Sequence, residues 1–558
     1  MLEQEIKLFV PPAARKAVAA QLASLAASRR VRLRAMYFDT ADRQLASRRA
    51  AIRLRQEGRK WVQTFKMEGG DAVSRIELNH PVSAPQLDLS VYAGTPAAPL
   101  LERLEGPLEA RYETDVMRAS CRVRTRGGTA EIAYDVGAIR AGGLELPVHE
   151  LEFELQSGRV DGLFALAGRW LRAHGLVLDV RSKAERGDAL AGAAARIAAA
   201  AEGGQAAARS AEIARFWAPV QAGKTGLRPH MTPAEALTAI SADCVDQIIR
   251  NAAALAEAAD ACGDGGEEHV HQLRVGIRRL RSAWRLFKEW TPLPDERLRQ
   301  AASAHFAAFG ALRDSDVLGG TLVPALQAAG MPPIAPAAAA EDAPDAATLA
   351  ASPAFQGWLL DMQAWNVGCR PPPARTAAAR PAKADPETAA VAARGALTIF
   401  GPGGEAASAV AAGAPASAGA AGSAEPAPAP KLADLAAGRM RKWHRRLAAQ
   451  GKNFHALADE QRHDLRKLAK RLRYALSFTE PLYRRSAVRP YRKQLAALQD
   501  ILGDINDLVV AREHYAALTE GHPQAWFALG WISGRLEALH AKAEAGFAAL
   551  KAAKPFWR

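Results

Sequence analysis

The sequence predicts an α+β protein in which a domain of antiparallel strands precedes a longer all-α region. Two observations predict this class. Short segments of alternating polar and apolar residues, separated by glycine-containing turns, fill roughly the first 200 residues, and many antiparallel strands of this kind close into a barrel or a sandwich. Further along the chain, apolar residues recur three and four positions apart, which is the spacing of amphipathic helices.

Length and charge limit the organisation of the chain and its partners. A chain of 558 residues is too long for one core, and at about 150 residues per domain it has room for roughly three or four units. The formal net charge of +14 predicts an anionic partner, which could be nucleic acid, a membrane surface or a phosphorylated compound. The cysteines form no C-x-x-C pair, and no stretch has the length and apolarity of a membrane span. We therefore expect a cytoplasmic protein with no membrane partner.

The first predicted strand, Leu2 to Leu8, carries charge on one face. Side chains two positions apart in a strand point to the same face. A second predicted strand, near the other end of the same domain, repeats this pattern. The alternating charged residues are Glu3, Glu5 and Lys7 in the first strand and Glu150, Glu152 and Glu154 in the second.

The strands predicted between these two carry mainly basic residues at alternate positions. They cover residues 36–39, 51–56, 61–67, 73–82, 121–126 and 129–136 and precede the strand at 144–156. A solvated face explains any one basic pair, such as Arg53 and Arg55. Several such strands in one domain predict a sheet face that collects both signs of charge, with carboxylates for a divalent metal and basic groups for phosphate.

The helical region begins with a capping signal. Thr232-Pro233-Ala234-Glu235 places threonine at the cap, proline at the first helical position and glutamate three residues after the threonine. This helix is expected to continue to about residue 259.

A basic helical motif occurs twice, 192 residues apart. The motif HQLRVGIRRLR begins at His271 and recurs as HDLRKLAKRLR from His463, and the signatures LRDSDV from Leu312 and GDINDL from Gly503 follow the two copies. Repetition of this kind indicates a duplicated unit. The span from Arg439 to Arg473 contains 12 Lys or Arg and 3 Asp or Glu residues. Like charges one helical turn apart repel each other, so an anion bound there would stabilise the helix.

The strand series resembles the CYTH domain, also called the triphosphate tunnel metalloenzyme fold. The resemblance is carried in order by E-x-E-x-K from Glu3, YFDT from Tyr37, IRLR from Ile52, TFK from Thr64, EIAYD from Glu131, ELEFE from Glu150 and SKAERG from Ser182. It implies an eight-stranded antiparallel barrel that forms a tunnel over residues 1–200. It also implies hydrolysis of a triphosphate with Mg²⁺ or Mn²⁺.

The same resemblance assigns roles by position. The implied metal-side carboxylates are Glu3, Glu5, Glu150, Glu152 and Glu154, and catalysis would involve Glu3, Glu5 and Lys7. The implied substrate contacts are Lys7, Arg53, Arg55, Lys66, Arg75, Arg118 and Lys183. Arg118 is placed through the TDVMR segment from Thr114, and Arg75 lies in an AVSRIE segment where relatives often have two basic residues. Glu131 and Asp135 are further acidic candidates.

The repeated helical motifs resemble the CHAD domain. This resemblance implies two pseudo-symmetric helical bundles, over residues 229–368 and 432–558, with a basic surface that binds inorganic polyphosphate. The implied contacts are His271, Arg274, Arg278, Arg281, His463, Arg466, Lys467, Lys470 and Arg473. Residues 201–228 are expected to be a linker, and the Ala/Pro/Gly-rich insertion at 369–431 is expected to be disordered and without a chemical role.

The expected activity is hydrolysis of inorganic triphosphate to pyrophosphate and phosphate. The same tunnel in relatives serves thiamine triphosphate or cyclises ATP, and the sequence reveals no pocket for an organic group. A second hypothesis is a polyphosphate-binding protein whose tunnel holds an anion without hydrolysing it, although a pure anion binder gains nothing from a carboxylate cluster. Nucleic-acid binding ranks third, because few aromatic residues accompany the basic stripe. The oligomeric state stays open.

Overall fold

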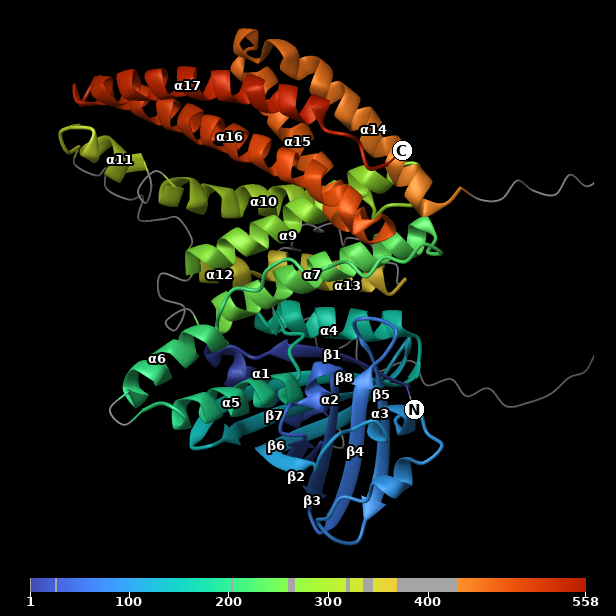
Figure 1. The fold of residues 1–558 in the computed structure, drawn as a ribbon. Helices are drawn as coiled ribbons and strands as arrows, with labels where there is room; N and C mark the ends of the chain where they lie inside the picture. Colours follow the sequence, from blue (N-terminus) through green and yellow to red (C-terminus); the bar gives the residue numbers. More distant parts are fainter. Residues whose placement is uncertain are drawn as a thin grey trace, which may run out of the picture. The chain divides into compact units, whose positions relative to one another are not determined.

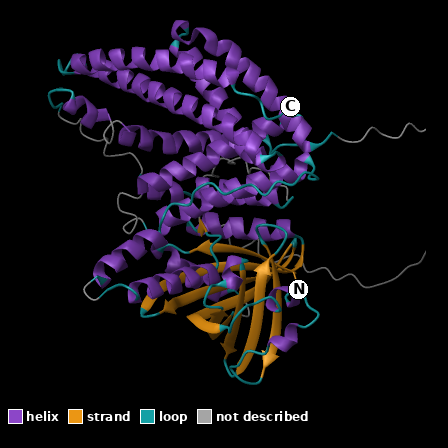
Figure 2. Ribbon diagram, viewed as in Figure 1, coloured by secondary structure: helices purple, strands orange, loops and turns teal. Residues whose placement is uncertain are grey.

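The computed structural model describes residues 2–25, 28–201, 204–258, 266–317, 322–334, 345–368 and 430–557. The described residues of Met1–Pro371 and Lys431–Arg558 form one compact unit. Strands occupy its N-terminal part and long helices the remainder (Figures 1 and 2). The predicted insertion at 369–431 lies almost wholly outside the described residues.

The strands form a closed antiparallel barrel. They are β1 (Leu2–Phe9), β2 (Arg29–Asp39), β3 (Ala50–Glu57), β4 (Lys60–Glu68), β5 (Ser74–Val82), β6 (Glu109–Thr125), β7 (Gly128–Ala141) and β8 (Leu144–Gly158). They pair in the order β5-β4-β3-β2-β6-β7-β8-β1, and β1 also pairs with β5, which closes the ring. The short strand β9 (Val177–Leu178) adds to β1 outside the ring. The expected eight-stranded barrel is confirmed.

The alternation in β1 explains why the barrel has a polar interior. Ile6 and Leu8 are 2% and 0% exposed, and they belong to the core that packs against helix α4 (Val160–His174). The residues that alternate with them, Glu5 and Lys7, point to the opposite face. Because every strand of a barrel alternates in this way, an apolar outer layer leaves the charged side chains inside.

Several helices accompany the barrel. Helix α5 (Lys183–Ala198) packs on β6, β7 and β8, and α4 packs on β1 and β8. The shorter helices are α1 (Arg15–Ser24), α2 (Gln44–Ser47) and α3 (Ala98–Leu101). The span predicted as a linker, 201–228, contains helix α6 (Gln205–Phe216), which is tied to α5 by an ion pair of 2.8 Å between Glu212 and Arg196. Part of that span is therefore packed structure.

The helical region contains two sets of packed helices. The first set comprises α7 (Pro233–Glu257), α9 (Gly266–Phe287), α10 (Glu296–Val317), α11 (Val323–Ala328), α12 (Ala346–Ala351) and α13 (Pro353–Asn366). The second set comprises α14 (Leu432–Gln450), α15 (Asp459–Thr479), α16 (Arg485–Leu518) and α17 (Ala525–Ala552). The predicted capping box is present, since the Thr232 hydroxyl accepts from the Glu235 amide and the Glu235 carboxylate accepts from the Thr232 amide.

The two copies of the basic motif lie on α9 and α15, and these two helices pack against each other. The duplicated signatures that follow them lie on α10 and α16. The side chains of the first signature, from Leu312 onward, lie outside the described residues. The repeat in the sequence thus corresponds to equivalent helices that meet at one contact.

Candidate active site

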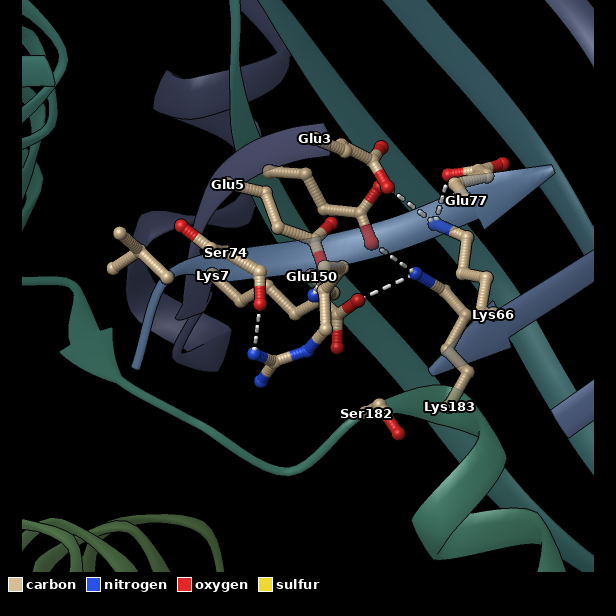
Figure 3. A network of polar contacts seen from close by, with 12 residues as sticks. Glu3, Glu5, Lys7, Lys66, Ser74, Glu77, Glu150, Ser182 and Lys183 are labelled. Atoms are coloured by element: carbon tan, nitrogen blue, oxygen red, sulfur yellow. Dashed lines mark hydrogen bonds and ion pairs between the residues drawn. The ribbon is translucent and has the colours of Figure 1, made fainter. Parts of the chain in front are cut away.

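The charged residues predicted for the tunnel come together inside the barrel. Strand register brings them to neighbouring positions, with Glu5 opposite Glu154, Lys7 opposite Glu152 and Lys66 opposite Glu77. Directly paired residues of antiparallel strands share a face, so these side chains point into the same space. Figure 3 shows that β1, the neighbouring strands and the start of α5 supply polar side chains to the same region.

One group of ion pairs is centred on Lys66. Its ammonium lies 2.9 Å from a Glu3 oxygen and 2.6 Å from a Glu77 oxygen, which places it between these two carboxylates (Figure 3). Arg53 approaches Glu77 to 3.8 Å and donates a hydrogen bond of 3.2 Å to the Tyr37 hydroxyl. Two predicted phosphate contacts are therefore held by carboxylates of the same site.

The two carboxylates beside Lys66 have pKa values shifted in opposite directions. Burial raises the pKa of Glu3 to about 8, and a hydrogen bond with the Glu77 carboxyl adds to the rise. Although burial also acts on Glu77, the Lys66 ammonium and the Glu3 hydrogen bond hold the pKa of Glu77 below its usual range. At neutral pH the pair therefore behaves as one carboxylic acid and one carboxylate.

A second group is centred on Lys183 and Arg118. Arg118 forms a bidentate pair with Asp135, with two contacts of 2.7 Å, and also contacts Glu152. The Lys183 ammonium lies 2.8 Å from Asp135 and 2.9 Å from Glu152, and it also contacts Glu150. Lys183 is the first residue of α5, whose N-terminus is capped by the Ser182 hydroxyl. The helix start thus fixes the origin of this side chain.

Two arginines of β3 keep donors available in this interior. The Nε atoms of Arg53 and Arg55 are buried and have no hydrogen-bond partner among the described residues. Burial, followed by the positive charges of Arg53 and Arg118, lowers the pKa of Arg55. A buried donor without a partner costs free energy. An anion between these guanidinium groups would satisfy both donors and relieve their mutual repulsion.

The remaining predicted residues have more varied surroundings. Lys7 contacts Glu5, which lies two positions earlier on the same face of β1. Glu154 accepts a hydrogen bond of 2.8 Å from Gln156, and burial raises its pKa. Arg75 donates to the Ser74 carbonyl at 2.8 Å and lines a small hollow with Glu5 and Lys7. Glu131 pairs with the exposed Arg122 at 3.6 Å, whereas Asp135 is 1% exposed and belongs to the second group.

The sequence analysis missed three residues of this network. Glu77 shares a strand face with Lys66, and only the register of β4 and β5 reveals the contact. Arg186, in the first turn of α5, contacts Glu150. It belongs to the SKAERG motif, but no role was predicted for it. Tyr37 lies in the recognised YFDT motif and accepts from Arg53. The contact of Glu77 depends on strand pairing and has no signal in the sequence. Arg186 and Tyr37 lie in motifs of the CYTH resemblance, so the sequence could have indicated them.

The carboxylates fit a hard divalent cation by their chemistry. Magnesium and manganese prefer oxygen ligands, and Glu3 and Glu77, both beside Lys66, offer carboxylate oxygens from neighbouring strands. In the arrangement of the described residues, no three His, Cys, Asp or Glu side chains gather closely enough to hold an ion. The reason is visible in the contacts, because Lys66 and Lys183 lie among the carboxylates and neutralise them.

A second charged site lies where α9, α10 and α15 meet. The guanidinium carbons of Arg274, Arg278 and Arg281 lie 5.0, 5.3 and 5.4 Å from the ring centroid of Phe306 on α10. These distances are within the range of cation-π contacts. One aromatic ring thus gathers three cations of the first basic motif.

The second basic motif adds to the same positive region. Burial, followed by the charges of Arg278, Arg466 and Arg473, lowers the pKa of the Lys470 ammonium to about 6. Asp507 approaches Arg466 to only 3.9 Å. Positive charge therefore dominates the surroundings of Lys470, a condition that a bound polyanion would reverse.

The other residues predicted for this surface lie at its margin. His463 shares a hydrogen bond of 3.0 Å with the Asn506 side chain, and Lys467 pairs with Asp464 at 3.3 Å. Both are exposed, whereas His271 on α9 is half-buried. The helix contact brings Arg278 and Lys470 together, while His463 and Lys467 face a separate groove between α15 and α16.

Comparison with known families identifies both parts of the chain. The CYTH family model matches residues 1–187, and the CHAD family model matches residues 239–516. The chain contains a CYTH domain followed by a CHAD domain. The CYTH match covers the closed barrel and the start of α5, and the CHAD match extends from α7 into α16. The family resemblance expected from the motifs is confirmed.

Individual relatives are more distant. An inorganic triphosphatase from Haemophilus influenzae is 30% identical over 154 residues, which are 27% of this chain and 44% of that protein. The match therefore spans less than half of the relative.

Two solved structures cover the two domains separately. The CHAD domain from the plant Ricinus communis is 27% identical, covers 60% of this chain and 98% of its own, and has a TM-score of 0.41. A putative adenylyl cyclase from Hippeastrum, described as having a dominant triphosphatase activity, is 23% identical, covers 34% and 95% of the two chains, and has a TM-score of 0.26. Within the described residues, no helix has the length and apolarity needed to cross a membrane.

Proposed function

We propose that the CYTH domain hydrolyses inorganic triphosphate to pyrophosphate and phosphate with Mg²⁺ or Mn²⁺, and that the CHAD domain binds inorganic polyphosphate. The observation that carries the first part is a pair of buried arginine Nε donors, on Arg53 and Arg55, that have no hydrogen-bond partner within the described part of the chain and lie beside an interior rich in carboxylates. Cationic donors and carboxylates together suit a metal-bound polyphosphate, whereas a simple anion site requires the cations alone.

The substrate would extend along the basic residues of the barrel. Arg53 and Arg55 offer planar guanidinium groups that match phosphate oxygens, and Lys66, Arg118 and Lys183 supply further positive charge. In the absence of substrate these groups are held by carboxylates. Phosphate oxygens would take over part of those contacts, so the groups need only small movements to bind triphosphate.

The carboxylates would hold the metal and orient water. Glu3, Glu5 and Glu77 form one candidate ligand set, and Glu150, Glu152 and Glu154 form the other. A bound divalent ion supplies neutralisation of the charge on the phosphate oxygens. Water attacks a terminal phosphorus atom, the bond to the bridging oxygen breaks and pyrophosphate leaves. The arginines and lysines stabilise the transferring phosphoryl group, so catalysis depends on positioning and charge.

The hydrolysis is tested by phosphate release from triphosphate, thiamine triphosphate, ATP and long-chain polyphosphate, with magnesium, with manganese and with chelator. We expect metal-dependent release from triphosphate that falls at least about 100-fold in a Glu3→Gln variant. Glu145→Gln is the matched control, because Glu145 pairs with the exposed Arg140 away from the interior group. Wild-type protein that releases phosphate from none of the four compounds would contradict the proposed hydrolysis.

A specific observation supports polyphosphate binding by the CHAD domain. Five arginines of the two repeated motifs surround Phe306 or raise the positive potential at Lys470, and Asp507 approaches one of them, Arg466, only to 3.9 Å. Binding should weaken as salt rises, since polyanion binding releases counterions. Competition between polyphosphate and duplex DNA at fixed salt separates the two anions. Displacement of bound polyphosphate by an equal phosphate concentration of DNA would favour nucleic-acid binding instead.

A further inference from the structure

A chain of buried charges connects the barrel interior with the first helix of the CHAD domain. Its barrel end is Glu150, which contacts Lys183 and Arg186 of α5. Its other end is Glu257, the last residue of α7, which contacts Arg181 in the segment that precedes α5. Glu257 and Arg186 also lie close enough for the Glu257 charge to raise the pKa of Arg186, after larger effects of burial and Glu150.

The segment between β9 and α5 is short and firmly held. The Asp179 amide donates to the Lys7 carbonyl at 3.1 Å, which ties the segment to β1. Asp179 then accepts from the Arg181 amide at 2.9 Å and from the Arg181 guanidinium at 3.0 and 2.9 Å. Only Ser182 separates Arg181 from Lys183 in the sequence. Any shift of Arg181 therefore moves the origin of the Lys183 side chain.

Two helices of the CHAD domain, α7 and α13, contact this segment or the start of α5 at two further points. Arg250 contacts Glu185 in the first turn of α5 and is held by Asp246 on its own helix at 2.9 Å. The amide of Leu178 in β9 donates to the side chain of Gln356 on α13 at 2.8 Å. The CHAD domain therefore holds the segment from β9 to α5 on both sides of Lys183.

The position of Glu257 is unfavourable for its own helix. A carboxylate at a helix C-terminus faces the negative end of the helix dipole. It is also largely buried, with a side chain 11% exposed. A buried carboxylate in this position requires a cation, and Arg181, a residue on the barrel side, provides it. The contact thus gives a partner of opposite charge to a buried residue on each side of the domain junction.

We infer that Glu257 of the CHAD domain is a positioning residue for the CYTH site, because it holds Arg181 and thereby fixes the segment that carries Lys183. The inference rests on the proposed function only in taking Lys183 as a triphosphate contact. It means that a residue outside the CYTH domain contributes to binding of the CYTH substrate. A purely structural ion pair at the junction would stabilise the protein without acting through Lys183.

A double-mutant cycle in the full-length protein separates these two roles. The variants are Glu257→Gln, Lys183→Met and the double substitution, assayed for triphosphate hydrolysis and for triphosphate affinity by calorimetry. We expect Glu257→Gln to raise KM and weaken triphosphate binding about tenfold, with a smaller change in kcat. In the Lys183→Met background the same substitution should have almost no further effect, because its route to the substrate is already lost.

The matched control is Asp243→Asn. Asp243 lies on the same helix and pairs with the buried Arg279 at 2.7 Å inside the CHAD domain. The substitution removes a buried ion pair of α7 that lies within the CHAD domain. The triphosphate affinity of this variant should therefore equal that of the wild type. If Lys183→Met is unfolded by circular dichroism, Lys183→Gln replaces it in the cycle, since the amide can still hydrogen-bond to the carboxylates although the cation is lost.

Each outcome bears on one proposal. Full additivity in the cycle, or an equal effect of Asp243→Asn, would overturn the positioning role of Glu257. Wild-type protein that binds triphosphate without hydrolysing it would contradict the proposed activity, and the affinities would still decide the role of Glu257. Wild-type protein that neither binds nor hydrolyses triphosphate would overturn both.

Discussion

The lowered pKa of Lys470 predicts that the proposed binding of polyphosphate takes up a proton. With a pKa of about 6 in the free protein, the ammonium is only about 3% protonated at pH 7.5. A polyanion beside Arg278 and Arg466 would reverse the local potential and raise this pKa towards its ordinary value near 10. Binding at pH 7.5 should therefore take up about one proton per site.

The sign of the pH dependence follows from the same shift. Below pH 6 Lys470 is charged before and after binding, so affinity is independent of pH there. Above pH 6 the free protein must bind a proton to form the complex, and affinity falls up to about tenfold per pH unit until the pKa of the complex is reached. The physical cause is the burial of the Lys470 side chain, followed by repulsion from the neighbouring cations.

Isothermal titration calorimetry measures this uptake directly. The binding enthalpy for long-chain polyphosphate is compared in buffers of different ionisation enthalpy at pH 7.5 and fixed salt, and the slope gives the number of protons. A Lys470→Met variant should give a slope near zero, because it lacks the ammonium that takes up the proton. The polyphosphate itself should contribute little to the slope, since terminal phosphates are few in a long chain. A wild-type slope equal to that of Lys470→Met, with binding intact, would refute the reasoning.

Three further predictions concern stability and the positive region. Arg118→Met leaves the buried Asp135 and Glu152 with Lys183 as their shared cation, and the free energy of unfolding should fall by about 3 kcal/mol in urea denaturation; an unchanged midpoint would contradict this. Thr232→Ala removes the capping box of α7 and should cost about 1 kcal/mol in the same assay, whereas Thr232→Ser should cost much less. Phe306→Ala removes the ring that gathers three arginines, so polyphosphate should bind roughly fivefold more weakly in a filter-retention assay. Equal affinity with intact helicity would count against a role for the ring.

The sequence carried most of the barrel because strand alternation is a local property. Glu3, Glu5 and Lys7 are two positions apart, so their common face follows from the pleat alone. Strand ends were less well predicted. The expected strand at 121–126 is the end of β6, which already begins at Glu109, since its earlier residues do not alternate strictly.

The contacts that depend on pairing could not be read from the chain. Glu77 meets Lys66 because β4 and β5 are in that register, and a shift of one residue would reverse its face. Glu257 lies in another domain, more than 70 residues from Arg181, and its helix gives no sign of the partner. Ion pairs across a domain junction become visible only when the two domains are packed together.

Closure of the barrel determines when its charged interior can exist. Strand β1, the first strand of the chain, pairs with β5 and β8, so its last partner is made only after roughly 150 residues have been synthesised. Non-local pairings of this kind fold slowly because loop entropy is lost before the contacts form. Glu3, Glu5 and Lys7 therefore remain in water at least until β8 has been synthesised, and they enter the tunnel in the step that completes the ring. Closure of the ring and assembly of the site are consequently one folding event.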